Sequence, residues 1–76
     1  MSKQSFYFEN REGIHSKFWA ILITDSSYGW TLTRRWGRIG EEGRVMQERI
    51  VNLRTAERRK DKLIKEKLAK GYKPVL

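Results

Sequence analysis

Four short stretches of the chain are rich in β-branched and aromatic residues and carry the patterns expected of β-strands. They are Ser5 to Glu9, Lys17 to Thr24, Trp30 to Trp36 and Arg44 to Asn52. Lys17 to Thr24 is apolar on both faces, which predicts a central strand covered on each side. The others alternate in side-chain character between their two faces. Short polar turns between the stretches indicate antiparallel pairing.

The last third of the chain has the spacing of an amphipathic helix. Thr55 is a residue type that caps helix N-termini, Glu57 suits a first turn, and Gly71 is placed to end the helix. The predicted buried stripe of this helix consists of Ala56, Leu63, Ile64 and Leu68. Together the elements predict a single α+β domain over residues 1–76, an antiparallel β-sheet of about four strands with one C-terminal helix packed on one face.

The composition argues against several kinds of chemistry. The chain has no cysteine and a single histidine, His15, so neither a metal-ligand cluster nor a catalytic relay is expected. The carboxylate pairs Glu41–Glu42 and Glu9/Glu12 have no pocket or positioning motif around them. We therefore expect a protein that is not an enzyme and that has no cofactor, metal or small-molecule substrate.

Apolar runs in the chain are short. The longest, Phe18 to Ile23, falls far below the roughly 20 residues that cross a membrane. No apolar signal core follows Lys3 near the N-terminus. These patterns predict a cytoplasmic protein without a membrane partner.

Positive charge is concentrated in the second part of the chain. Residues 1–32 carry three basic and three acidic groups, whereas residues 33–76 carry fourteen basic and six acidic groups. The whole formal net charge of +8 therefore lies after residue 32. Such asymmetry favours a polyanionic partner, and nucleic acid is the obvious class. A solvated basic face that only maintains solubility would give the same count.

One short segment combines an aromatic ring with guanidinium groups, namely Arg34-Arg35-Trp36-Gly37-Arg38. Guanidinium groups bind phosphate oxygens through paired hydrogen bonds, and a Trp ring stacks on a base or sugar. Alternatively, Trp36 is a core anchor like Trp19 and the arginines are merely solvated. The glycines that follow do not match the spacing of a phosphate-binding loop, and we expect a hairpin turn there.

Three groups of residues along the chain form a recognisable set. The first is Ser16-Lys17-Phe18-Trp19, at the start of a predicted strand, and the second is Arg35-Trp36-Gly37-Arg38-Ile39-Gly40. The third, in the predicted helix and its exit, consists of Ala56, Asp61-Lys62-Leu63-Ile64, Glu66-Lys67 and Lys70-Gly71-Tyr72. Taken together, these groups resemble the WGR domain, a small module of poly(ADP-ribose) polymerases and of many bacterial proteins, over nearly the whole length; the second group is similar to the motif that names the family.

The resemblance implies a fold of an antiparallel sheet with a packed helix. In the polymerases the module takes part in binding a DNA break, and the motif Trp stacks against the end of a strand. Carried over by position, the resemblance implies that Trp36 is the stacking residue and that Arg38 contacts phosphate or a partner. Lys60 departs from the family pattern, which has Phe or a small residue there. It either removes an apolar contact beneath the helix or extends its ammonium group to the helix edge and adds to the basic surface.

We therefore expect a nucleic-acid-binding module that takes DNA rather than RNA through phosphate contacts and aromatic stacking. The alternative is a protein-interaction module that docks an acidic partner or another domain. The candidate nucleic-acid-binding residues are Trp36, Gly37, Arg38, Arg34, Arg35 and Arg44.

Overall fold

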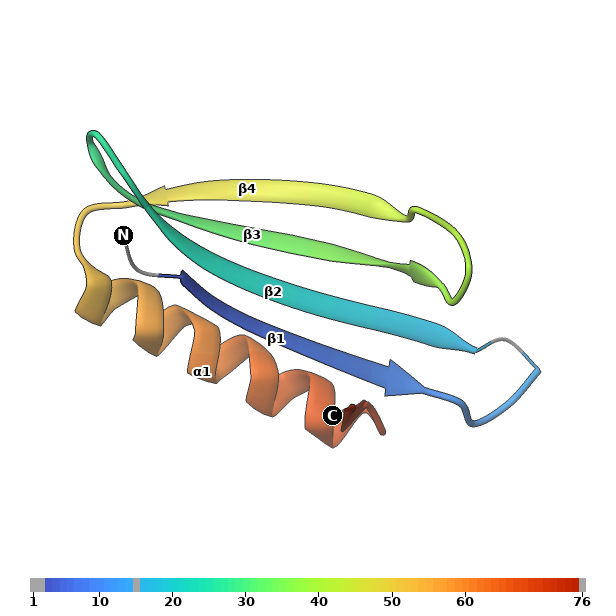
Figure 1. The fold of residues 1–76 in the computed structure, drawn as a ribbon. Coiled ribbons are helices and arrows are strands. Elements are labelled where there is room, and N and C mark those ends of the chain that lie inside the picture. The colour runs from blue at the N-terminus through green and yellow to red at the C-terminus, as the bar shows by residue number, and fades with distance from the viewer. Residues whose placement is uncertain (1–2, 15, 76) are drawn as a thin grey trace.

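Residues 3–14 and 16–75 fold as one five-stranded antiparallel β-sheet with a single helix across one of its faces (Figure 1). The computed structural model describes residues 3–14 and 16–75. The strand order is β4-β3-β2-β1-β5. The elements are β1 (Lys3–Asn10), β2 (Lys17–Ser26), β3 (Gly29–Arg38), β4 (Arg44–Ile50), α1 (Leu53–Ala69) and β5 (Lys73–Pro74). The predicted α+β architecture is thus confirmed.

The fifth strand is the main difference from the predicted sheet of about four strands. β5 contains only Lys73 and Pro74, which pair with Glu9 and Phe8 of β1. Two residues are too few to produce a period-two pattern, so the sequence carried no signal for this strand. Its position follows from the turn that ends the helix.

α1 begins earlier than predicted. Asn52, not Thr55, is the N-cap, and its side-chain oxygen accepts a hydrogen bond from the backbone N–H of Thr55 at 2.8 Å. β4 accordingly ends at Ile50, before the predicted end at Asn52. Because of the earlier start, Glu57 lies beyond the first turn of the helix. Its carboxylate accepts a hydrogen bond from the side-chain amide of Gln4 at 3.1 Å.

The end of α1 agrees with the sequence-based expectation. Gly71 has a φ of +96°, a left-handed conformation that favours glycine, and directly follows the C-cap Lys70. The backbone N–H groups of Gly71 and Tyr72 donate to the carbonyls of Leu68 and Lys67 at 3.1 Å each. This pair of bonds is the Schellman arrangement, which reverses the chain toward β5.

The hydrophobic core lies between the sheet and α1. None of its members is more than 7% exposed, and they are Phe8, Trp19, Ile21, Ile23, Leu32, Ala56 and Leu63. The predicted stripe of the helix was only partly right, because Ile64 is half-buried and Leu68 is 47% exposed. Successive helical residues turn by about 100°, so Leu68 points about 140° away from Leu63.

The prediction that β2 is covered on both faces was wrong for one of them. Among the described residues, no helix lies over the sheet face opposite α1 (Figure 1). On this open face Ala20 and Leu22 are half-buried. Phe18 is buried there by a stacked Tyr7 ring, with centroids 6.0 Å apart, and by the neighbouring glycine loop.

Candidate functional site

Trp36 lies on the sheet face that α1 covers, near the C-terminal end of the helix. It is paired across the strands with Trp19, and its half-buried ring packs against the core. It also lines a hollow of about 290 Å³ between the sheet and the helix. The hollow is lined by Trp19, Arg34, Trp36, Met46, Leu63, Glu66, Lys67 and Lys70. Trp36 therefore both anchors the core and borders an accessible concave site, which we call the Trp36 hollow.

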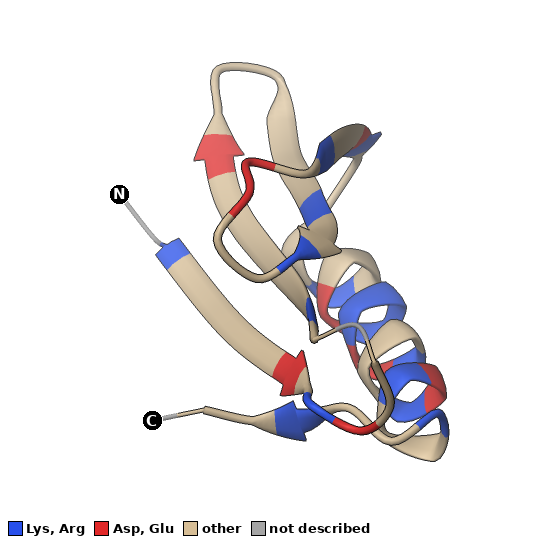
Figure 2. Ribbon diagram, turned by 90° about the vertical axis from the view of Figure 1, so that its right-hand side faces the viewer, with Lys and Arg blue, Asp and Glu red and all other residues tan. Residues whose placement is uncertain are grey.

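Basic residues surround this hollow from two directions. Lys67 and Lys70 come from the end of α1. The strand register places three more on the same face of the sheet, because Lys17 pairs with Arg38 and Trp36 pairs with Arg44. Figure 2 shows the basic residues recurring along α1 and at the end of β3. The strand ends and the helix end thus bring together cations that are far apart in the sequence.

Lys67 is at the centre of these charges. Burial lowers the pKa of its ammonium group, and the nearby positive charge of Lys70 lowers it further. The carboxylate of Glu66 acts in the opposite direction, while Arg34 and Lys17 add to the lowering. A group held among like charges in this way gains interaction energy when an anion arrives.

Two aromatic rings stabilise this lysine. Its Nζ lies 5.8 Å from the centroid of Trp19 and 5.3 Å from that of Tyr72. Such cation–π contacts favour the charged form and hold the side chain in place. The lysine is also in the last turn of α1, where the helix dipole favours positive charge.

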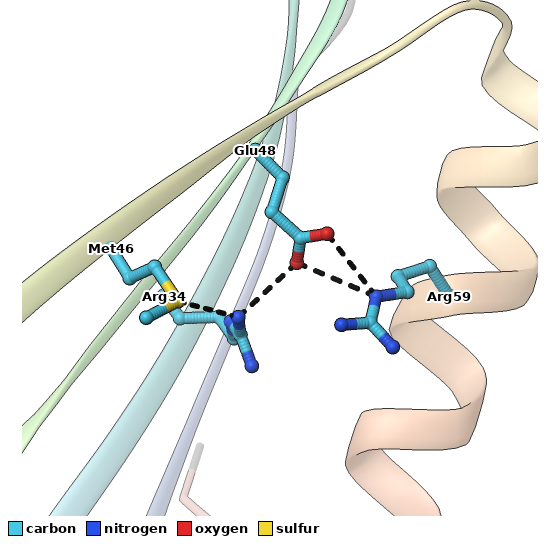
Figure 3. A network of polar contacts seen from close by, with 4 residues as sticks. All are labelled: Arg34, Met46, Glu48 and Arg59. Carbon is cyan, nitrogen blue, oxygen red and sulfur yellow. Dashed lines mark hydrogen bonds and ion pairs between the residues drawn. The ribbon is translucent and has the colours of Figure 1, made fainter.

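Arg34 is held in a network that joins the sheet to the helix (Figure 3). Its Nη2 lies 3.2 Å from Oε1 of Glu48 and donates to the sulfur of Met46 at 2.8 Å. The Nε of Arg59 approaches the other oxygen of Glu48 at 3.3 Å. The Nε of Arg34 is buried without a hydrogen-bond partner. Arg34 therefore supports the wall of the Trp36 hollow and contributes charge to it.

Arg35 lies on the opposite side of the sheet from Trp36. It pairs with Ala20 of β2 and Val45 of β4 on the open face, and its Nε donates to the backbone carbonyl of Glu42 at 2.7 Å. The period-two alternation of β3 separates the neighbouring arginines, as it must in any strand. The structure thus groups Trp36, Arg34, Arg38 and Arg44 on one face and places Arg35 on the other.

Gly37, the middle residue of the motif, lies near the end of β3 and packs closely against the loop that follows this strand. A Cβ at this position would lie 2.8 Å from the Cα of Gly43. Gly43 itself has a φ of +78°, and a Cβ there would collide with the carbonyl oxygen of Trp36. The two glycines allow the chain to cross closely between β3 and β4. The segment is a hairpin connection, as expected from its sequence.

Sequence reasoning missed Lys67, which lies on the inward stripe of α1, and Lys70, the exposed C-cap that continues the same spacing. That stripe follows the spacing Ala56, Lys60, Leu63, Lys67 and Lys70. Lys60 fits neither alternative fully: its Nζ lies 4.8 Å from the centroid of the Phe6 ring, and its side chain is only 13% exposed, so it adds little to the basic surface. That Nζ also pairs with Asp61 at 3.1 Å. The three- and four-residue spacing of these positions was the available signal for the inward face of the helix. The lysines were not assigned to that face because a hydrophobic pattern counts lysine as polar.

We also searched the described residues for a metal site and for a membrane-spanning helix. Among residues 3–14 and 16–75, no three His, Cys, Asp or Glu side chains cluster as metal ligands would. In the same ranges, no helix is long and apolar enough to cross a membrane. His15 lies outside the described residues.

The comparisons with known proteins agree with the motif around Trp36. Neither the curated proteins nor the solved structures gave a significant match to the chain. The family model described as the WGR domain matches residues 3–76, essentially the entire sequence. The chain therefore belongs to the WGR domain family.

Proposed function

We propose that this protein is a non-enzymatic module that binds DNA at the Trp36 hollow. The observation that carries the proposal is the half-buried Trp36 ring beside the cations Lys67, Lys70 and Arg34. Membership of the WGR family supports a nucleic-acid partner, and the resemblance to the polymerase modules favours DNA over RNA.

Phosphate groups suit the electrostatics of this surface. Burial and the positive charge of Lys70 both destabilise the charged form of Lys67. A phosphate oxygen nearby would offset both effects. Arg38 and Arg44 are exposed at the adjacent strand ends, where they can reach a phosphate backbone that continues past the hollow. Contacts of this kind bind DNA without reading its sequence.

Trp36 would add stacking to these contacts. The side of the ring that faces the hollow is available to a base or sugar, while the rest of the side chain packs on the core. Stacking contributes roughly 1–3 kcal/mol per base and requires a base face that no neighbouring base covers. We therefore expect a preference for ends or single strands over uninterrupted duplex.

Fluorescence anisotropy with labelled blunt duplex, overhanging duplex and single-stranded DNA tests this proposal. If about three or four phosphates are engaged, the affinity should fall about 40- to 150-fold between about 50 and about 200 mM salt. Replacing Arg38 by Ala should weaken binding. Arg35→Ala, which removes the same charge from the open face, should have a smaller effect. An absence of saturable binding to all three DNAs at low salt would refute the proposal.

The stacking contribution needs its own variants because Trp36 also packs in the core. Trp36→Phe keeps an aromatic ring of smaller area, and Trp36→Leu keeps an apolar side chain without one. Thermal unfolding would establish that both variants remain folded. Binding should weaken modestly for Phe and more for Leu, and the loss should be larger for single strands than for duplex. Equal affinities for the two variants would exclude stacking.

A further inference from the structure

The open face of the sheet has the character of an interaction surface. Tyr7 is 39% exposed and Val45 is 59% exposed, and between them lie the half-buried Ala20 and Leu22. A hollow of about 300 Å³ is formed on this face by Ser5, Ala20, Leu22, Thr33, Arg35 and Val45. Apolar surface thus remains accessible at the centre of a sheet that a helix covers only on its other side.

Arg35 projects at the edge of this hollow in a held orientation. Its Nε donates to the carbonyl of Glu42 at 2.7 Å, which restrains the orientation of the guanidinium group. Among the described residues, its two terminal nitrogens have neither a hydrogen-bond nor an ion-pair partner. A guanidinium fixed at one nitrogen presents the other two to a carboxylate.

The remaining charges of the open face favour an acidic partner. The strand register places Lys3 and Arg49 on this face together with Arg35. The carboxylate of Glu9, on the same face, is already bound by Arg11 at 2.9 Å and by the Tyr7 hydroxyl at 2.9 Å. Glu41 lies on the other side of Arg35, next to Tyr7 and Phe18. A carboxylate is therefore best accommodated on the side where Thr33 and Val45 lie.

We propose that the open face docks a protein partner that presents a carboxylate to Arg35 and an adjacent apolar side chain to the hollow between Leu22 and Val45. This inference is independent of DNA binding at the Trp36 hollow. Duplex or single-stranded nucleic acid fits the open face less well, because its cations are separated by apolar and small hydroxyl side chains. Burying those side chains stabilises a protein contact and contributes little to a phosphate contact.

Selection of peptides from a displayed random library tests the inference. The library is first depleted on the folded Arg35→Glu variant and is then selected on the wild-type protein. Enriched peptides should combine Asp or Glu with a neighbouring Leu, Ile, Val or Phe. A synthetic copy of the leading peptide should bind the wild type, and Arg35→Glu and Val45→Asp should each weaken it at least about tenfold, as expected for a close charge pair and a buried apolar contact.

Arg58→Glu is the matched control, because it makes the same charge change on an exposed position of α1. It should leave peptide affinity within about twofold of the wild type, since charges distant from the contact act weakly in salt. The proposal is overturned if no peptide is enriched, if Arg58→Glu weakens binding as much as Arg35→Glu, or if labelled DNA displaces the peptide. If the wild-type protein binds the peptide but does not bind DNA, only the function proposed for the Trp36 hollow is refuted.

Discussion

Single residues in this domain combine a structural role with a role in the proposed binding site, and Lys67 is the clearest case. Its aliphatic stem lies on the inward stripe of the helix, and its ammonium group lies beside the rings of Trp19 and Tyr72. Burial and the charge of Lys70 lower its pKa, so the folded state holds this proton less tightly than the unfolded chain does. The position is electrostatically unfavourable for folding and favourable for receiving an anion.

This lowered pKa predicts a specific pH dependence of stability. Between the folded pKa of Lys67 and its ordinary value of 10.5, the unfolded chain binds more protons, so the lysine's contribution to the free energy of unfolding rises with pH. Below that range the penalty is fully present. Urea unfolding of the wild type and of Lys67→Met should be measured from about pH 8.5 to about 10.5. The free energy of unfolding of the wild type should rise over this range relative to that of the variant. Parallel curves would contradict the prediction.

Glu48 is a second residue whose removal should be informative. It joins Arg34 of β3 to Arg59 of α1, and its side chain is 28% exposed. We expect Glu48→Ala to lower the free energy of unfolding by about 1–3 kcal/mol, because it leaves the largely buried Arg34 without its carboxylate. Arg59→Ala should cost less than about 1 kcal/mol, since Arg59 is 39% exposed. Equal losses in urea unfolding would contradict this account.

At the scale of elements, the start of α1 depends on one side chain. Asn52 satisfies an N–H of the first turn, as shown by its 2.8 Å bond to Thr55. Asn52→Ala should therefore destabilise the domain by about 1 kcal/mol, and Asn52→Asp should be nearly neutral. Thr55→Ala should cost less than Asn52→Ala. Thermal unfolding of the three variants distinguishes this assignment from a cap at Thr55, which would reverse the order of the two Ala variants.

The helix start also illustrates how far sequence could predict the elements. Both Asn52 and Thr55 belong to residue types that cap helices, and only the position where β4 stops pairing decides between them. The long strands and Gly71 were predictable because period-two patterning and a left-handed glycine act locally. β5 was not, because its two residues pair only after the helix has returned the chain to β1. The motif made Trp36 the candidate residue, and that assignment stays a prediction; the lysines that lie beside it depend on how the helix packs.

At the scale of the whole molecule, the sheet separates two surfaces of different character. The face covered by α1 ends in the cations around Trp36, while the open face has an apolar centre with spaced charges. The bulk net charge of +8 could not distinguish these surfaces. The strand register does so, because it places Arg35 and Arg38 on opposite sides although they are three residues apart.

This separation predicts how individual charges contribute to the proposed DNA binding. Replacing Arg38 or Arg44 by Ala should each reduce the slope of log affinity against log salt by about 0.9, the value for one lost phosphate contact. Arg49→Ala removes the same charge from the open face and should leave the slope unchanged. The slopes follow from anisotropy titrations at several salt concentrations. A reduced slope for Arg49→Ala would show that DNA also contacts the open face.

Lysines on the inward stripe of α1 imply a trade-off between stability and binding. Lys60 and Lys67 occupy positions where leucine would bury more apolar surface and would avoid desolvating an ammonium group. Variants selected only for resistance to heat should therefore acquire apolar residues at both positions. If the proposed function holds, those at Lys67 would produce a more stable domain with a lower affinity for anions.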